Sequence, residues 1–138
     1  MRRFTRFPKR RGRIEWSNAP DVHKKIVKLA SLLGLGWLKK DKIFCFRSIN
    51  ANTRAIARIW GLSRIWQQAL KIGPSYVVEV ISERYDGLSE HEKDSVLIHE
   101  LNHIPHNFSG SLMPHTRRGK SSFHKRVSIL LEKYYKNA

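Results

Sequence analysis

Residues 89–105 have the sequence SEHEKDSVLIHELNHIP and predict a helix with a defined start and a defined end. Ser89 stands three residues before Glu92, the spacing of a capping box, in which each side chain accepts a hydrogen bond from the other residue's backbone N–H. Pro105 lacks a backbone N–H and ends or sharply kinks the helix. The apolar residues at helical spacing are Leu97, Ile98, Leu101 and Ile104. We therefore expect this helix to bury one face in the core.

Three polar residues of this helix, His99, Glu100 and His103, have the spacing of a zinc site. Histidines four residues apart are separated by about 400° around a helix, so both imidazoles project from one face and can bind one metal ion. Glu100 leans toward the open side of that metal. Zinc lowers the pKa of a bound water from about 16 to about 7, and a neighbouring carboxylate can take the proton as hydroxide attacks a carbonyl. The pattern predicts one zinc ion with Glu100 as general base.

A catalytic zinc usually has three protein ligands and one water, so a third ligand is expected after the helix. His115 lies in a long loop, residues 105–120, from which the chain can return over the metal, and it is the favoured candidate. His106 follows the proline that disturbs the helix, and we expect it to face solvent or to support a ligand. The remaining alternatives belong to the last predicted helix and are His124 and Glu132.

Residues 96–115, VLIHELNHIPHNFSGSLMPH, resemble a small family of metallopeptidases found in archaea and phages. The similarity extends over about residues 44–124 and includes RAIARIWGL at 54–62 and YVVEVISE at 76–83. In that family the pattern HELxHIP, then FSG, then PH is specific. The resemblance implies a zincin-like fold with Glu100 as base, and its implied metal ligands are His99, His103 and His115.

The same segment is similar to SprT-like proteases, whose third histidine follows the helix at a comparable distance in sequence. Those proteases act on proteins bound to DNA, which would suit a basic chain.

Two features of the sequence depart from the pattern of the archaeal and phage family. Asn102 stands where an apolar residue is commoner, and the Arg-rich amino terminus is not part of the family's core.

The charge balance predicts a polyanionic partner. The chain has 27 Lys and Arg against 11 Asp and Glu, a formal net charge of +16. Seven of the eleven acidic residues fall between Glu79 and Glu100, so both ends of the chain are strongly basic. RNA or DNA is therefore the expected partner, and the ribosome is one candidate because small, very basic proteins with extended tails are typical of ribonucleoprotein particles.

Two clusters of cations are candidates for contact with nucleic acid. The first lies in an expected tail, residues 1–17, and comprises Arg2, Arg3, Arg6, Lys9, Arg10, Arg11 and Arg13. The second lies beyond the proposed zinc helix and comprises Arg117, Arg118 and Lys120, with Lys125 and Arg126 further along. Phe4 and Phe7 lie among the tail cations and could stack on bases. We expect residues 18–138 to form one domain.

The remaining pattern predicts an α+β fold. A helix is expected from Pro20 to Gly34, and another from Ser121 or Ser122 onward. Strands are expected at residues 42–48, 54–60 and 76–81. The first two could form a hairpin, whereas residues 64–70 fit either a strand or a short helix. Residues 76–81 could pair with an extended peptide or could be an ordinary inner strand. The expected sheet has about three strands, mixed or antiparallel, packed on the histidine-bearing helix.

The sequence has no apolar stretch long enough to cross a bilayer and no secretory signal, so we expect a cytoplasmic protein. Its single cysteine, Cys45, permits no internal disulfide and is expected to be a buried hydrophobe. Two functions remain open. One is a zinc endopeptidase that acts on intracellular, nucleic-acid-associated proteins. The other is a non-catalytic RNA-binding protein of a ribonucleoprotein particle that retains a zinc site.

Overall fold

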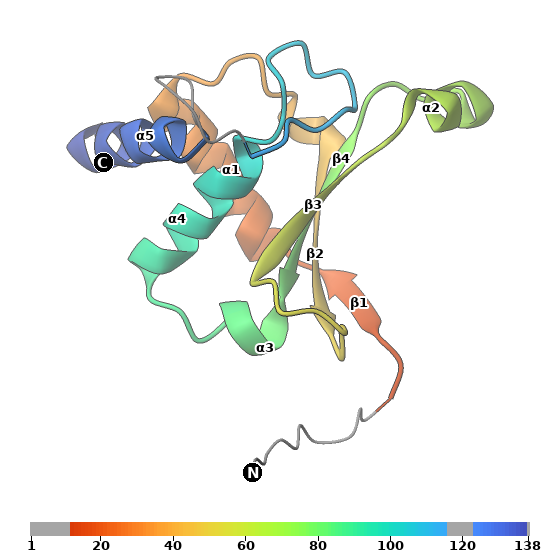
Figure 1. Cartoon of the computed structure of the whole chain (residues 1–138), viewed down its shortest axis with the longest axis horizontal. Helices are drawn as coiled ribbons and strands as arrows, with labels where there is room; N and C mark the ends of the chain where they lie inside the picture. The colour runs from red at the N-terminus through yellow and green to blue at the C-terminus, as the bar shows by residue number, and fades with distance from the viewer. Residues whose placement is uncertain (1–11, 116–122, 138) are drawn as a thin grey trace.

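The computed structural model describes residues 12–115 and 123–137, and the statements below concern these residues. Helices α1, α4 and α5 gather on one side of a four-stranded sheet (Figure 1). In chain order the elements are β1 (Glu15–Asn18), α1 (Pro20–Leu33), the 3₁₀ turn η1 (Lys40–Lys42), β2 (Ile43–Ile49), β3 (Ala57–Gly61), α2 (Arg64–Leu70), β4 (Tyr76–Ile81), α3 (Ser82–Tyr85), α4 (Glu90–Leu101) and α5 (Phe123–Asn137). The predicted α+β class is confirmed.

The sheet has the strand order β1-β2-β4-β3. Strand β2 runs parallel to β4 and antiparallel to β1, and β3 is antiparallel to β4. The expected hairpin between the first two predicted strands is therefore wrong, because β4 lies between them. Strand β4 takes the inner position because its β-branched residues are buried on both faces of the sheet.

The fourth strand, β1, was not predicted. It consists of residues Glu-Trp-Ser-Asn, all exposed, and it has no apolar alternation that would mark a strand. Its conformation comes from antiparallel pairing with β2, where Trp16 lies opposite Ser48. Residues 15–17 of the expected tail thus belong to the sheet, and residues 1–11 lie outside the described residues.

Helix α1 follows its local signals closely. Pro20 occupies the start of the helix, and Gly34 ends it with φ of 68°, in the left-handed region that glycine adopts without steric cost. The side chains it buries have the predicted helical spacing and are Val22, Ile26, Leu29, Ala30 and Leu33. This face packs against β2, α4 and α5.

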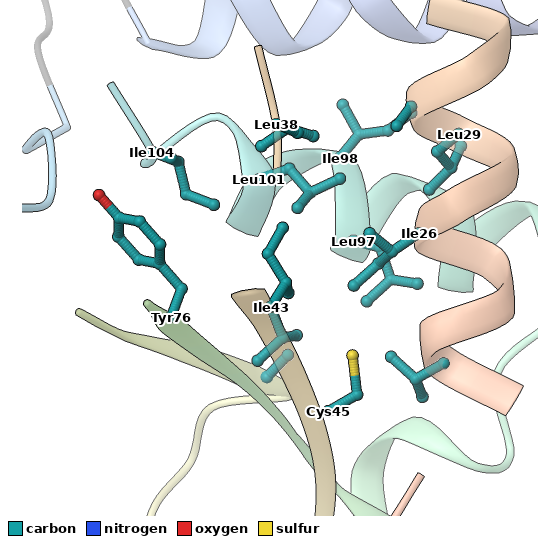
Figure 2. Packing of buried hydrophobic residues seen from close by; sticks show 14 of the residues in the cluster. Ile26, Leu29, Leu38, Ile43, Cys45, Tyr76, Leu97, Ile98, Leu101 and Ile104 are labelled. Carbon is teal, nitrogen blue, oxygen red and sulfur yellow. The ribbon is translucent and has the colours of Figure 1, made fainter. Parts of the chain in front are cut away.

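The core fills the space between the sheet and the three large helices. Figure 2 shows its centre, where side chains from α1, β2 and α4 meet: Ile26, Leu29, Ile43, Cys45, Leu97, Ile98 and Leu101. Cys45 is buried as predicted, and burial raises the pKa of its thiol to about 12. The ring of Tyr76 enters the same core, but its hydroxyl points away from the aliphatic side chains (Figure 2).

Residues 64–70, which the sequence left undecided, form helix α2. The helix buries none of its residues and lies at the far end of the β3–β4 pair, away from the other helices (Figure 1). No helix within residues 12–115 and 123–137 is long and apolar enough to cross a bilayer.

Candidate metal centre

Helix α4 begins with the predicted capping box. The Ser89 hydroxyl accepts a hydrogen bond from the Glu92 backbone N–H at 3.1 Å, and the Glu92 carboxylate accepts one from the Ser89 N–H at 2.9 Å. The helix ends at Leu101 with Asn102 as its cap. Its start is therefore fixed by side chains, and its apolar face fixes its rotation against the core.

His103 lies two residues past the last α-helical residue, which corrects the expectation that both histidines belong to one regular helix. The His103 N–H donates to the Glu100 carbonyl at 3.1 Å, and the Ile104 N–H donates to the Leu101 carbonyl at 3.0 Å. These bonds span three residues, so the chain tightens into a 3₁₀-like turn here. The rings of His99 and His103 still lie side by side, with centroids 5.3 Å apart.

His115 returns to these two rings and completes a group of three. One ring nitrogen from each of the three histidines lies within 4.8 Å of the others. The Nε2 atoms of His99 and His115 are 3.1 Å apart. Two nitrogens bound to one tetrahedral zinc at 2.0–2.1 Å are about 3.3 Å apart, so this separation suits two ligands of a single ion. The three imidazoles are therefore a donor set that could hold one metal ion.

The orientation of His103 is fixed by the loop that carries His115. The Nδ1 atom of His103 lies 2.6 Å from the Met113 carbonyl oxygen, which can only accept, so Nδ1 carries the proton. The Met113 N–H in turn donates to the His103 carbonyl at 2.7 Å. Nε2 of His103 is thereby left as the atom that can bind a metal.

The loop between α4 and His115 is anchored to the sheet by Tyr76. Its hydroxyl donates to the Ser111 carbonyl and accepts from the Gly110 N–H, both at 2.8 Å. Its ring meets the buried Phe108 ring edge-on, with centroids 4.9 Å apart. Phe108 has φ of 49° and Gly110 has φ of 98°, so the chain reverses sharply at this Phe-Ser-Gly sequence.

A second anchor joins the same loop to the end of β3. The backbones of Gly61 and Gly110 lie so close together that only glycine fits at position 61. A Cβ atom added to Gly61 would lie 2.1 Å from the Gly110 carbonyl oxygen. The Gln67 side-chain amide donates to the carbonyls of Leu62 and Ser109 at 2.8 and 2.9 Å. These contacts join two of the family-like segments, residues 54–62 and 108–110.

Phe123 lies beneath all three histidines. The side chain is fully buried, and its ring centroid is 4.7 Å from that of His99, 4.4 Å from His103 and 4.6 Å from His115. Phe123 is the first residue of α5, and nothing in the sequence indicated that its ring would contact the histidines. The ring excludes water from one side of the site.

Burial favours the uncharged imidazoles of His99 and His103. Burial and then the neighbouring histidines lower the pKa of His99 to about 4, and burial lowers the pKa of His103 as well. Neutral imidazole is the form that binds metals. Burial also raises the pKa of Glu100 to about 7, and a cation at the histidines would oppose that effect by favouring the carboxylate.

The other histidines considered as ligands lie outside this group. His106 packs its ring on Trp37, with centroids 4.4 Å apart, and His124 is exposed on α5. Glu132 is likewise exposed. The described residues thus bring His99, His103 and His115 together and exclude the three alternatives.

Most of the cations proposed for nucleic acid lie outside the described residues. These are Arg2, Arg3, Arg6, Lys9, Arg10, Arg11, Arg117, Arg118 and Lys120. Arg13 is described and exposed just before β1, and Lys125 is exposed on α5. Arg126 is half-buried, with its guanidinium carbon 5.9 Å from the centroid of the Phe123 ring.

Comparison with known proteins gives one match. A family model described as "Putative phage metallopeptidase" matches residues 14–127, which extend from just before β1 into α5 and include the three histidines, Glu100 and Phe123. This confirms the resemblance to a metallopeptidase family, whereas similarity to SprT-like proteases stays a prediction. Neither the curated proteins nor the solved structures contain a match.

Proposed function

The chain belongs to the phage metallopeptidase family, and we propose that it hydrolyses peptide bonds with one zinc ion bound by His99, His103 and His115. The observation that carries the proposal is the convergence of three imidazole nitrogens, and the half-buried Glu100 follows the first of these histidines, His99, directly in the chain. Three protein ligands leave a tetrahedral ion one position for water or substrate. When bound, zinc would lower the pKa of a water ligand to about 7 and polarise the scissile carbonyl.

Glu100 is the proposed general base and acid. It follows His99 directly and lies where burial weakens the hydration of its carboxylate. In this role Glu100 takes a proton from the attacking water and then gives it to the leaving amine, so each turnover restores its charge. His103, oriented by the Met113 carbonyl, and His115, held on the anchored loop, keep the reacting groups in fixed positions.

Strand β3 is the proposed site for the substrate backbone. Strand β4 is an inner strand with partners on both sides, so it cannot pair with an added peptide. Of the two alternatives for residues 76–81, the ordinary inner strand is therefore the correct one. Strand β3 is an outer strand of the sheet, contacts α4, and ends at Gly61, beside the loop that leads to His115. An extended peptide paired with β3 would present a carbonyl to the metal site.

Association with nucleic acid is the proposed setting for this activity. The net charge of +16 and the six cations within residues 2–11 support it, because such an excess attracts phosphates at physiological salt. The same charge supports the second candidate, a non-catalytic RNA-binding protein. The partner of such a protein would be ribosomal RNA or another structured RNA. The two candidates differ in one property, which is peptide cleavage.

Substitution of Glu100 tests the proposed reaction. Glu100→Gln is expected to retain zinc and to lose at least about 100-fold in cleavage rate, because an amide cannot accept the proton of water. New amino termini released from a zinc-loaded reaction with a disordered protein measure the rate. Glu132→Gln, an exposed acid on α5 outside the histidine group, is the matched control and should cleave as fast as the unchanged protein. Cleavage by Glu100→Gln at the unchanged rate would refute the role of Glu100, and no cleavage by the zinc-loaded unchanged protein would favour the RNA-binding function.

A further inference from the structure

The face of the sheet opposite the helices exposes three large aromatic side chains from three strands. Trp16 of β1, Phe44 of β2 and Trp60 of β3 are 57%, 48% and 51% exposed. Phe44 and Trp60 both lie in register with Val77 of β4, which is their common neighbour across the sheet. Alternate residues of a strand share a face, and Ile43 and Cys45 are buried under the helices, so Phe44 points to the opposite side.

A buried carboxylate holds the two indoles of this face. Glu79, on the inner strand β4, is 1% exposed, and its Oε1 atom accepts from Trp60 Nε1 at 2.9 Å while Oε2 accepts from Trp16 Nε1 at 3.2 Å. Because Trp16 stands on an outer strand with β2 between, its indole must extend across β2 to reach Glu79. Both indoles therefore lean inward over the sheet with their N–H groups fixed and their outer surfaces open.

Arg58 contacts both the Glu79 carboxylate and the Trp60 ring. Its Nε atom donates to Glu79 Oε1 at 2.7 Å, and its guanidinium carbon lies 5.2 Å from the centroid of the Trp60 ring. Glu79 is the only carboxylate that the four described strands place on this face, and Arg58 neutralises it. Exposed cations flank both ends of the strands: Arg13 and Arg54 at one end, Lys42 and Arg64 at the other.

The metal centre does not use this group of residues, which lies on the side of the sheet away from α4. Burying a carboxylate costs free energy, and here its hydrogen bonds hold two half-exposed rings in set positions. A monomeric protein rarely exposes several large aromatic side chains on one face without a partner. Fixed aromatic rings with exposed cations at both ends of their strands, on a chain of net charge +16, match single-stranded nucleic acid, whose bases stack while its phosphates contact the cations.

We propose that this open face binds single-stranded nucleic acid, with bases stacked on Trp16, Phe44 and Trp60 and phosphates near Arg13, Arg54, Lys42 and Arg64. The inference rests on the proposed association with nucleic acid and assigns it to residues other than those of the amino-terminal tail. Glu79 is a positioning residue for the two indoles. The face would bind one partner while the metal centre, on the opposite side of the sheet, acts on another.

Oligonucleotide binding by the full-length protein tests the proposal. Anisotropy of labelled dT12 gives the affinity, and the double variant Trp16→Leu/Trp60→Leu should bind about 25-fold more weakly or worse, since stacking on each ring contributes about fivefold or more. The matched control is Trp66→Leu on α2, which removes an equally exposed indole, 57% exposed, away from this face and should bind as the unchanged protein does. A stacking site also predicts tighter binding of dT12 than of a 12-base-pair duplex, because paired bases are not free to stack.

A second measurement does not depend on the stability of the double variant. In Trp37→Phe/Trp66→Phe, tryptophan emission comes from Trp16 and Trp60, and dT12 should quench it along the same binding curve that anisotropy gives. Unchanged affinity in a folded double variant, absence of quenching, preference for the duplex, or failure of the unchanged protein to bind dT12 would each overturn the proposal. None of these readings uses a peptide substrate, so failure of this inference is distinguishable from failure of the proposed hydrolysis.

Discussion

Tyr76 links the sheet to the histidine-bearing loop through a single hydroxyl. That hydroxyl makes hydrogen bonds to Gly110 and Ser111, four or five residues before His115, while the Tyr76 ring is buried in the core. The position of His115, the most exposed of the three histidines, thus depends on a residue that touches no metal. Groups that hold metal ligands in place commonly change metal affinity without changing the ligand set.

Tyr76→Phe is expected to weaken zinc binding by about 10- to 100-fold while leaving one binding site per chain. The change removes only the hydroxyl, so the Gly110 N–H and the Ser111 carbonyl lose their partner and the loop that carries His115 becomes less constrained. Competition with a zinc chelator of known affinity measures the effect. Tyr135→Phe, which removes an exposed hydroxyl on α5, is the control. Identical zinc affinity in Tyr76→Phe and the unchanged protein would contradict the anchoring role.

In the metal centre, the sequence predicted the three histidines but not the groups that hold their rings in place. The spacing of His99 and His103 and the long loop before His115 are local features that a reader can see in the sequence. The ring of Phe123 beneath them and the carbonyl of Met113 beside His103 are not, because their roles arise only when the loop and α5 fold back on α4. Side-chain type indicates that Phe123 is buried, but not what it is buried against.

Among the secondary-structure elements, the boundaries set by strong local signals were predicted within a residue or two. The capping box at Ser89, the glycine at position 34 and the β-branched run of β4 each specify conformation through neighbouring residues alone. Strand pairing is different, because it depends on residues far apart in sequence. The predicted hairpin of β2 with β3 failed for this reason, and β1 was missed because its four exposed residues become a strand only through β2.

Glu79 makes the stability of the sheet dependent on pH. Burial opposes ionisation of this carboxylate, but hydrogen bonds from Arg58, Trp60 and Trp16 outweigh it and lower the pKa to about 2. The ordinary pKa of a glutamate is about 4.3, so the folded state binds the proton less readily than the unfolded state does. Stability from this group is therefore fully present above about pH 4.5 and is lost as the pH falls toward 2.

We expect unfolding by denaturant to show a loss of about 2 kcal/mol from Glu79 between pH 4.5 and pH 2. Other carboxylates also titrate in this range, so the comparison is with Glu79→Gln, which cannot ionise. The variant should be less stable than the unchanged protein at pH 7, because it leaves Arg58 without its counter-charge, and the difference should narrow as the pH falls. A difference that stays constant from pH 7 to pH 2 would contradict the assignment.

For the whole molecule, two contacts with nucleic acid are proposed, one through the face of the sheet and one through the amino-terminal tail. The stacking face of the sheet depends on aromatic rings, whereas the tail contributes charge alone apart from Phe4 and Phe7. Charge contacts release counterions and make affinity fall steeply with salt, whereas stacking is much less sensitive to salt. The slope of log affinity against log salt is therefore a more direct measure of the contacts made by the tail than the affinity itself is.

Removal of residues 1–11 is expected to lower the affinity for a single-stranded oligonucleotide and to reduce the slope of log affinity against log salt. Each lost phosphate contact reduces the slope by about 0.7, so the six cations between Arg2 and Arg11 could account for at most about 4. Zinc content should not change, since β1 and every residue of the metal centre remain. A shortened protein with the same affinity and the same slope would show that the tail does not contact nucleic acid.

The central claim is that His99, His103 and His115 hold one zinc ion, and metal content measures it most directly. Elemental analysis after dialysis without chelator should give one zinc per chain for the unchanged protein and none for His99→Ala or His103→Ala. His115→Ala should retain zinc only weakly, and His106→Ala, whose ring packs on Trp37 outside the group, should retain it fully. A His115→Ala protein with one zinc per chain at undiminished affinity would contradict the account of the site.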